Sequence, residues 1–230
     1  MFFILLITTL AGTLSGQGQS AFLSDPAISP DGSKIVFVYE SDLWLADRDG
    51  GTAHRITAMT GEESVPRFSP DGKWLAFAST QNGNADVYLM PVEGGSIVQL
   101  TWHDANDYPD GWSWDSKTVY FTSDRYNTFG AYAVAATGGT PVRLFSDNFF
   151  DQAHNIVEIP GSNGQSFYFT SSWESYMFPQ RKRYRGENDP DIEFYNKSTG
   201  DYKRLTEWEG KDLWPSVDRN GKLWFASDEA

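Results

Sequence analysis

Apolar and polar positions alternate along this chain in short runs that recur at a nearly fixed spacing. The run KIVFV follows the tetrapeptide SPDG at 29–32, and the run WLAFA follows a second SPDG at 69–72, 40 residues later. Gly-Gly pairs recur at 50–51, 94–95 and 138–139, an interval of 44 residues each time. β-Branched and aromatic residues are frequent on both sides of each pair, and helical periodicity is absent after the first twenty residues. The pattern therefore predicts four short antiparallel strands per repeat.

Such a repeat is typical of a β-propeller, because a four-stranded sheet buries both of its faces only when further sheets pack on either side. We therefore expect an all-β fold, a β-propeller of four-stranded antiparallel blades, over residues 21–230. Four complete blades and part of a fifth leave strand edges uncovered, so we expect a domain that is incomplete at the C-terminus and belongs to a longer protein. The expected blades are 26–63, 64–107, 108–152, 153–212 and the partial 213–230.

The SPDG tetrapeptide has the composition of a turn. Pro presets φ near about −65°, Asp tolerates the next position, and Gly adopts the left-handed conformation that follows. This order is typical of a type I turn with a glycine bulge between two antiparallel strands. We therefore interpret Asp31 and Asp71 as turn residues and not as catalytic acids.

Residues 1–20 differ from the rest of the chain because they contain no charged side chain. Residues 2–11 form an apolar run of the length of a signal-peptide core, too short to span a membrane. Gly16 and Gly18 are small residues suited to cleavage before Gln19, although no Lys or Arg precedes the apolar run. We expect a signal peptide here, and hence an exported protein, periplasmic or extracellular. The alternative is a buried first strand.

The charge of the chain limits the classes of partner that it can bind. It carries 31 acidic and 18 basic side chains, a formal net charge of −13. An acidic surface repels nucleic-acid phosphates and anionic lipids, so we expect no nucleic-acid partner and no membrane insertion after signal removal. The sequence contains no cysteine, which excludes disulfides, thiol nucleophiles and thiolate metal sites within it. We expect no cofactor.

Details of the repeat resemble a known family. They are the pattern PxxSPDGxxxxF, the SD at strand ends, and a tail of the form D-[LV]-[WY]-L…GG…LT. These resemble the TolB-type (WD-like) propeller repeat, found in TolB, in dipeptidyl peptidases of the prolyl oligopeptidase kind and in tricorn-type serine peptidases. The opening blade, IVFVYESDLWLADRDGGTAHRIT, and the fourth-blade insertion SSWESYMFPQRKRYRGENDPDIEFYNKSTG are most similar to the N-terminal six-bladed propeller of tricorn-type serine peptidases.

In the tricorn family the serine nucleophile, its histidine and the oxyanion hole lie in a C-terminal catalytic domain. The resemblance therefore implies a segment without catalytic residues that gates or channels peptide substrates and products. Its implied partners are peptides or proteins, the downstream catalytic domains of the same chain and, in the full protein, further copies in a homo-oligomer. No GxSxG elbow occurs in these residues. Two alternatives stay open: a TolB-like periplasmic protein-binding scaffold without enzymatic activity, and the propeller of an α/β-hydrolase peptidase.

A basic run stands out in the fourth-blade insertion of this acidic chain. It places four cations within five residues: Arg181, Lys182, Arg183, Tyr184 and Arg185. Arginine binds carboxylates in bidentate fashion and a peptide ends in a carboxylate, so this run is our candidate for peptide-carboxylate binding. The alternative is a solvated loop that offsets neighbouring acids such as Glu187 and Asp189. Nucleic-acid binding is opposed by the net charge.

The other polar and aromatic candidates favour structural roles. His103 beside Asp104 and Asp107 comes nearest to a metal cluster, but its spacing matches no zinc motif, so we assign no metal site and no catalytic residue. Most tryptophans are expected to pack between blades. Trp102 and Trp173 lie next to loops, where stacking on a sugar or a peptide side chain is the alternative.

Overall fold

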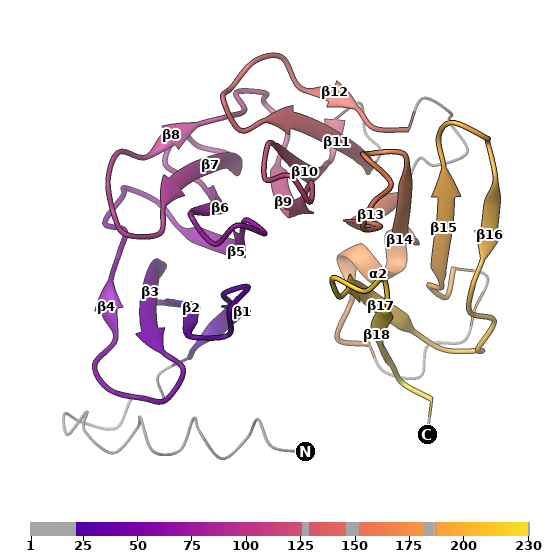
Figure 1. Cartoon of the computed structure of the whole chain (residues 1–230), viewed down its shortest axis with the longest axis horizontal. Helices are drawn as coiled ribbons and strands as arrows, with labels where there is room; N and C mark the ends of the chain where they lie inside the picture. The colour runs from indigo at the N-terminus through magenta and orange to yellow at the C-terminus, as the bar shows by residue number, and fades with distance from the viewer. Residues whose placement is uncertain (1–21, 126–128, 146–151, 182–185, 187, 230) are drawn as a thin grey trace.

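Five antiparallel sheets follow one another along the chain. The computed structural model describes residues 22–229 except 126–128, 146–151, 182–185 and 187, so the predicted signal peptide lies outside the described residues. Four sheets have four strands and the last has two. They stand in an open arc around a central axis, with the first strand of each sheet innermost and the fourth outermost (Figure 1). The fold is the β-propeller that the repeat predicts.

Every sheet is built from strands that are consecutive in the sequence. The first contains β1 (Ser24–Ile28), β2 (Lys34–Tyr39), β3 (Asp42–Asp47) and β4 (His54–Arg55). The second contains β5 (Glu63–Phe68), β6 (Trp74–Ser79), β7 (Asp86–Pro91) and β8 (Val98–Gln99). The third contains β9 (Asp107–Trp112), β10 (Thr118–Ser123), β11 (Gly130–Ala135) and β12 (Val142–Arg143). The fourth contains β13 (Ala153–Glu158), β14 (Ser166–Ser171), β15 (Ile192–Asn196) and β16 (Tyr202–Arg204), and the fifth contains β17 (Asp212–Val217) and β18 (Leu223–Ser227).

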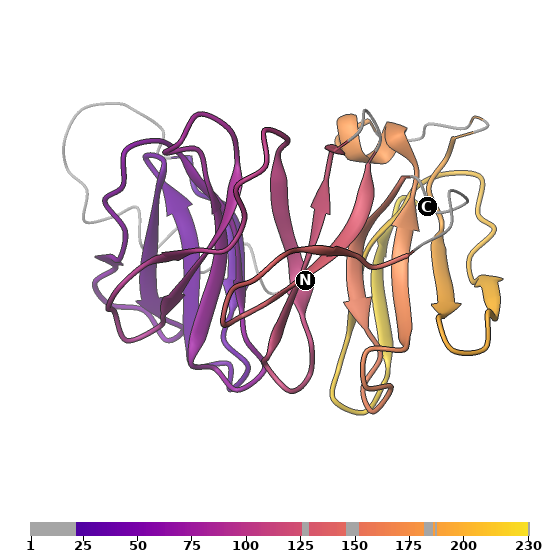
Figure 2. The same cartoon turned by 90° about the horizontal axis from the view of Figure 1, so that it is seen from above.

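One short helix departs from the all-strand expectation. Helix α2 (Trp173–Met177) lies in the insertion between β14 and β15, at the opposite end of the sheets from the turn between β13 and β14 (Figure 2). The Ser172 hydroxyl caps it by accepting hydrogen bonds from the amides of Glu174 and Ser175, at 3.1 and 3.4 Å. Five residues are too few to produce a recognisable helical period, which is why the sequence pattern did not reveal it. Within the described part of the chain, no helix has the length and apolar character needed to cross a bilayer.

The SPDG turns have the predicted form. Gly32 and Gly72 have φ of 72° and 73°, in the left-handed region that glycine adopts without strain. The amide of Gly32 donates to the carbonyl of Ser29 at 2.8 Å, and that of Gly72 donates to the carbonyl of Ser69 at 2.9 Å. Hydrogen bonds from the Ser29 hydroxyl and from the amide of Ser33 lower the pKa of Asp31 to about 2. The Asp31 carboxylate therefore serves its own turn.

Four of the inner strands share a bulge at the same position in the strand. Asp25, Val65, Asn155 and Trp214 occupy matching positions and have φ of 48°, 51°, 54° and 56°. Each lies where the pairing register with the second strand shifts. Such a bulge bends a strand and increases its twist, so we infer that these four inner strands share one local bend.

Buried polar residues line the junction between the second sheet and the third. The Thr101 hydroxyl accepts a hydrogen bond from the Val87 amide at 2.9 Å and donates one to Asp86 at 3.1 Å. Asp107, the first residue of β9, accepts a hydrogen bond from Arg125 at 2.7 Å. Burial, together with the charge of Asp107, raises the pKa of Asp86 to about 6. Asp107, which opens β9, thus acts electrostatically on an acid of the preceding sheet as well as bonding within its own.

The junction between the third and fourth sheets replaces this polar set with an apolar one. The positions that correspond to Asp86, Thr101 and Asp107 are occupied here by Gly130, Phe145 and Ala153. Phe145 is buried, and its ring centroid lies 5.7 Å from that of Phe167 and 5.3 Å from that of Phe169. Three aromatic rings from two sheets therefore fill the space that hydrogen bonds occupy elsewhere.

We predict that Phe145→Ala lowers the free energy of unfolding by about 3–5 kcal/mol, because it leaves a cavity between two sheets. Urea denaturation of the full chain, followed by tryptophan fluorescence, measures this change. Val142→Ala is the matched control in β12, where the valine is 59% exposed, and it should change stability by less than about 0.5 kcal/mol. Equal effects of the two substitutions would contradict the assigned packing.

Candidate functional site

The structure describes one residue of the predicted carboxylate site. Lys182, Arg183, Tyr184 and Arg185 lie outside the described residues. Arg181 is exposed and follows α2. Its Nη1 atom lies 3.4 Å from Glu174 Oε1, and its guanidinium carbon lies 5.9 Å from the centroid of the Phe178 ring. The start of the basic run is thus attached to the helix of the insertion.

A buried ion pair fixes α2 to the fifth sheet. The Glu174 carboxylate is fully buried, and its Oε2 atom lies 2.8 Å from Lys211 Nζ, whose side chain is 3% exposed. Lys211 also donates a hydrogen bond to the Phe178 carbonyl at 2.5 Å. A buried charge without a partner is strongly destabilising, so this contact holds the insertion in one place above the strands.

His154 supports the same helix from the fourth sheet. Its Nε2 atom lies 2.9 Å from Ser175 Oγ and 3.1 Å from the Ser172 carbonyl, and its Nδ1 atom lies 2.8 Å from Asn155 Oδ1. Ser175 and His154 are each 2% exposed, so a substrate cannot reach the hydroxyl and the pair serves to position α2. Burial lowers the pKa of His154 to about 4.

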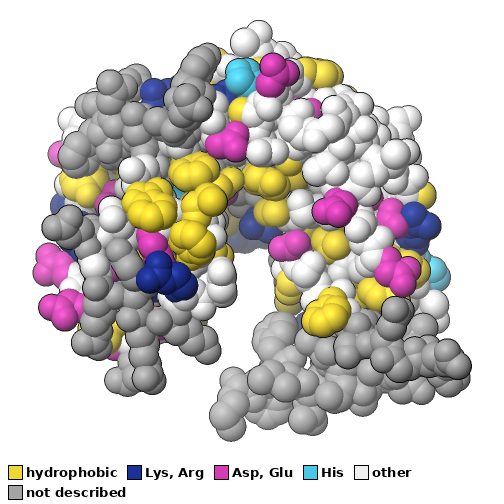
Figure 3. All heavy atoms as spheres, turned by 180° about the vertical axis from the view of Figure 1, so that it is seen from behind, with side chains coloured by type: hydrophobic (Ala, Val, Ile, Leu, Met, Phe, Trp, Pro, Cys, Tyr) yellow, Lys and Arg dark blue, Asp and Glu magenta, His cyan; other side chains and the backbone are white. Residues whose placement is uncertain are grey.

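The exposed side chains of α2 form an apolar surface, which we call the α2 patch: Trp173, Met177 and Phe178. They are 40%, 53% and 38% exposed. The Trp173 and Phe178 rings meet edge to face with centroids 6.4 Å apart. In Figure 3 hydrophobic side chains gather beside the central hollow of the arc, with basic side chains next to them.

A second polar group lies on the inner strands and was missed by the sequence analysis. The Arg67 side chain on β5 donates from Nε to the Asp110 carbonyl on β9 at 2.9 Å, which joins two neighbouring inner strands. The Asp110 carboxylate accepts a hydrogen bond from the Thr122 hydroxyl at 2.6 Å, and burial raises its pKa to about 6. The signal was present in the sequence, since Arg67 and Asp110 occupy neighbouring positions of the first strand in two successive repeats.

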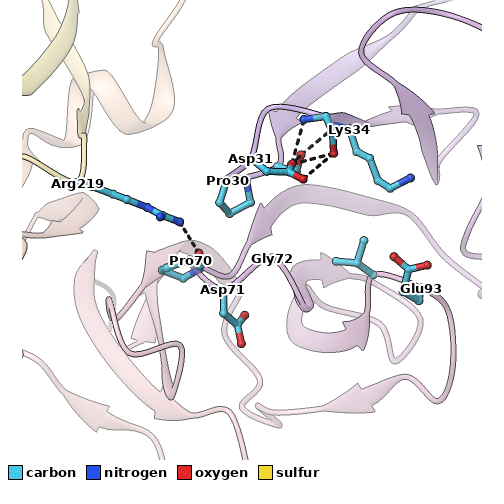
Figure 4. A pocket seen from close by; sticks show the side chains of 11 residues that line it. Pro30, Asp31, Lys34, Pro70, Asp71, Gly72, Glu93 and Arg219 are labelled. Atoms are coloured by element: carbon cyan, nitrogen blue, oxygen red, sulfur yellow. Dashed lines mark hydrogen bonds between the residues drawn. The ribbon is translucent and has the colours of Figure 1, made fainter.

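At the other end of the sheets, the SPDG turns surround a pocket of about 320 Å³. Arg219, in the turn between β17 and β18, extends towards the turn of the second sheet and donates to the Pro70 carbonyl at 3.2 Å (Figure 4). Lys34, Asp71 and Glu93 also line the pocket. The first, second and fifth sheets therefore meet at this end.

The remaining candidates are the possible metal ligands near His103 and the tryptophans. No group of three or more potential ligands suited to a metal ion occurs among the residues that the structure describes. His103 Nδ1 accepts the Ala105 amide at 3.0 Å, a role within its own loop. Trp112 is buried between sheets as expected, whereas Trp102 is 64% exposed. Trp214 lies on an inner strand and is 53% exposed, which differs from the packing role expected for most tryptophans.

We predict that Lys211→Met destabilises the full chain by about 3–5 kcal/mol, because it leaves the Glu174 carboxylate buried beside Arg181 alone. Glu174→Leu combined with Lys211→Met should restore most of the loss, since both buried charges are then removed. Urea denaturation measures all three variants. Lys117→Met, which breaks an exposed pair with Asp115, is the control and should cost less than about 1 kcal/mol. A double variant as unstable as the single one would refute the ion-pair role.

We also predict an acid-dependent loss of stability that His154 causes. The folded-state pKa of His154 is depressed, so the unfolded chain binds the proton more readily, and stability falls as the pH drops from the unfolded pKa of 6.5 through about 4. The loss is on the order of 3 kcal/mol for a buried imidazole with this shift. Denaturation of wild type and His154→Gln between pH 7 and pH 4 isolates the effect, and parallel pH profiles would contradict it.

Comparisons with known proteins agree with this geometry. The protein named "Putative tricorn protease homolog 2" of Streptomyces coelicolor is 40% identical over 85 residues, which are 36% of this chain and 7% of that protein. A TolB homolog of Chlorobium luteolum is 31% identical over 80 residues, 34% of this chain and 18% of that protein. The crystal structure of the tricorn protease superposes with a TM-score of 0.73 at 22% identity, over 92% of this chain and 20% of that one, which shows a shared fold.

The chain therefore spans less than a fifth of either of these curated relatives. The family described as the tricorn protease N-terminal β-propeller domain matches residues 20–230. Since that match covers nearly the whole sequence, the chain belongs to the tricorn N-terminal β-propeller family.

Proposed function

We propose that this chain is the non-catalytic N-terminal propeller of an exported, tricorn-like serine peptidase, and that it gates or channels peptide substrates and products. The observation that supports this most is the family match over residues 20–230. Hydrolysis would take place in downstream catalytic domains of the same chain. The signal peptide expected at residues 1–20 would direct the protein to the periplasm or beyond.

The shape of the arc supports a role in peptide passage. The inner strands surround a central hollow (Figures 1 and 3), and the Arg67–Asp110 contact places charged groups on them. An extended peptide presents both amides and side chains, so a wall of strand backbone with fixed charges can orient it. The turns of the first, second and fifth sheets surround the pocket at one end, which leaves the α2 end as the proposed entrance.

The basic run of Arg181, Lys182, Arg183, Tyr184 and Arg185 is proposed as the group that binds peptide carboxylates. Arg181 is attached to α2 through Glu174 and Phe178, and α2 is attached to the sheets through Lys211. A cation on a fixed support loses less conformational entropy on binding than one on a free loop. This arrangement favours capture of an anionic peptide end near the hollow.

A TolB-like protein-binding scaffold without enzymatic activity is the second candidate. It is supported by the similarity to the Chlorobium luteolum TolB homolog and by a TM-score of 0.58 with the TolB crystal structure from Acinetobacter baumannii. Such a scaffold binds proteins through its surface. Its protein partners would be recovered intact on an affinity column, and added peptides would not be hydrolysed.

We predict that the full-length protein hydrolyses peptides and that a fluorophosphonate, which reacts with serine nucleophiles, stops the reaction. Replacing Arg181, Arg183 and Arg185 together by Ala should raise KM about tenfold for peptides with a free C-terminal carboxylate. The kcat should be unchanged, because the lost contact stabilises substrate and transition state equally.

Two comparisons make this test decisive. C-terminally amidated peptides without acidic side chains should lose nothing, and Lys197→Ala with Lys203→Ala is the control for removal of exposed positive charge in the same blade. A protein that leaves every peptide intact and retains envelope proteins on an affinity column would favour the scaffold. Hydrolysis with an unchanged KM would remove the carboxylate role alone.

A further inference from the structure

Exposed apolar side chains are concentrated at α2. Outside the two-stranded fifth sheet and the N-terminal residues, the described large apolar side chains that are exposed mostly occur singly, such as Val98 on β8 and Val142 on β12. The α2 patch instead gathers Trp173, Met177 and Phe178 within six residues. A contiguous apolar surface of this kind marks a binding site more often than scattered exposed residues do.

The patch is held rigidly by polar groups beneath it. Glu174 and Ser175, on the same helix, are buried and contact Lys211 and His154 respectively. The buried charged pair keeps the helix in one position beneath the three exposed apolar side chains. The helix is thereby preorganised, and preorganised aromatic residues are typical of the energetic centres of interfaces.

The charge at the edge of the patch selects its occupant. Arg181 lies above the Phe178 ring and 3.4 Å from Glu174 Oε1, and Glu174 Oε2 also lies 2.8 Å from Lys211 Nζ. The three charges therefore sum to a positive value beside an apolar surface. The three side chains of the patch can contact one or two apolar residues of a ligand. The patch is therefore far smaller than a standard protein–protein interface, and its size suits a peptide segment. An anionic membrane extends far beyond the patch and is repelled by the net charge of −13, whereas a single side-chain carboxylate contacts the local cation.

The helix also borders the inner strands. The Tyr176 ring lies edge to face with His154 of β13 at a centroid distance of 5.6 Å. Burial raises the pKa of the Tyr176 phenol, with further contributions from Tyr108 and Asp110 of β9. A ligand on the α2 patch would therefore lie beside the central hollow, as Figure 3 shows for the apolar side chains on this face.

We propose that the α2 patch, with Arg181 at its edge, docks peptide segments that carry an apolar side chain next to an acidic one. This inference rests on the proposed handling of peptides and names the class of peptide that the entrance prefers. The apolar side chain packs on Trp173, Met177 and Phe178, and the side-chain carboxylate binds Arg181. The site recognises an internal segment, so it does not require a free C-terminus.

Fluorescence polarisation with the full chain tests the proposal. The probe is a dye-labelled, C-terminally amidated peptide with adjacent leucine and glutamate residues in a glycine–serine background. We expect it to bind at least about tenfold more tightly than the same peptide with Leu→Ser or with Glu→Lys changes. Trp173→Ser with Met177→Ser and Phe178→Ser should lose about tenfold in affinity, and Arg181→Gln should abolish the preference for glutamate over lysine.

The controls separate this site from folding and from catalysis. Trp102→Ser with Val98→Ser and Val142→Ser removes three apolar side chains elsewhere that are 50–64% exposed, and this variant should bind like wild type. If the triple α2 variant unfolds, Met177→Ser alone carries the test, because that side chain is 53% exposed. Binding is measured without hydrolysis, so a protein that cleaves no peptide can still confirm the patch.

Three results would overturn the proposal. They are unchanged binding by the α2 variants, binding that requires a free C-terminal carboxylate, and binding of anionic phospholipid vesicles in place of the peptide. Cleavage of peptides together with any of these would leave the proposed function intact and remove only the α2 docking site.

Discussion

Apolar contact between neighbouring blades is the constraint on which the rest of the structure depends. Among the described residues, Val36 and Leu43 of the first sheet pack with Phe77 and Met90 of the second. The same holds between the second and third sheets and between the third and fourth. A single sheet would expose one half of each cluster, so the blades are stable only side by side. The repeated turns and the repeated bulges follow from that requirement, because every sheet must present the same two faces.

The fold could be predicted because its signals are local. The glycines at 32 and 72 mark turns, and Leu100 and Leu144, which the repeat places in one register, are both buried. Leu205 holds the same register and is 41% exposed, because the sheet that follows it has only two strands to cover it. A periodic pattern indicates which side chains face an adjacent sheet. It does not indicate how completely that sheet covers them.

The candidate site was less accessible to sequence reasoning because it depends on contacts between distant residues. Glu174 and Lys211 are 37 residues apart in the sequence, and neither is part of a motif. The basic run drew attention by its composition, whereas the buried groups that hold its first residue gave no compositional signal. Arg67 and Asp110 were overlooked for the same reason, since their contact joins two repeats that were each interpreted separately.

The apolar third junction makes the blades non-interchangeable. Phe145 needs the small Ala153 and the rings of Phe167 and Phe169 beside it, all from the fourth sheet. An acid such as Asp107 in place of Ala153 would lie against a phenyl ring without a hydrogen-bond partner. Similar repeats within one chain are prone to pair in the wrong order during folding. Pairing a polar edge with an apolar one would be unfavourable. The apolar junction between the third and fourth sheets therefore favours the correct order of the blades during folding.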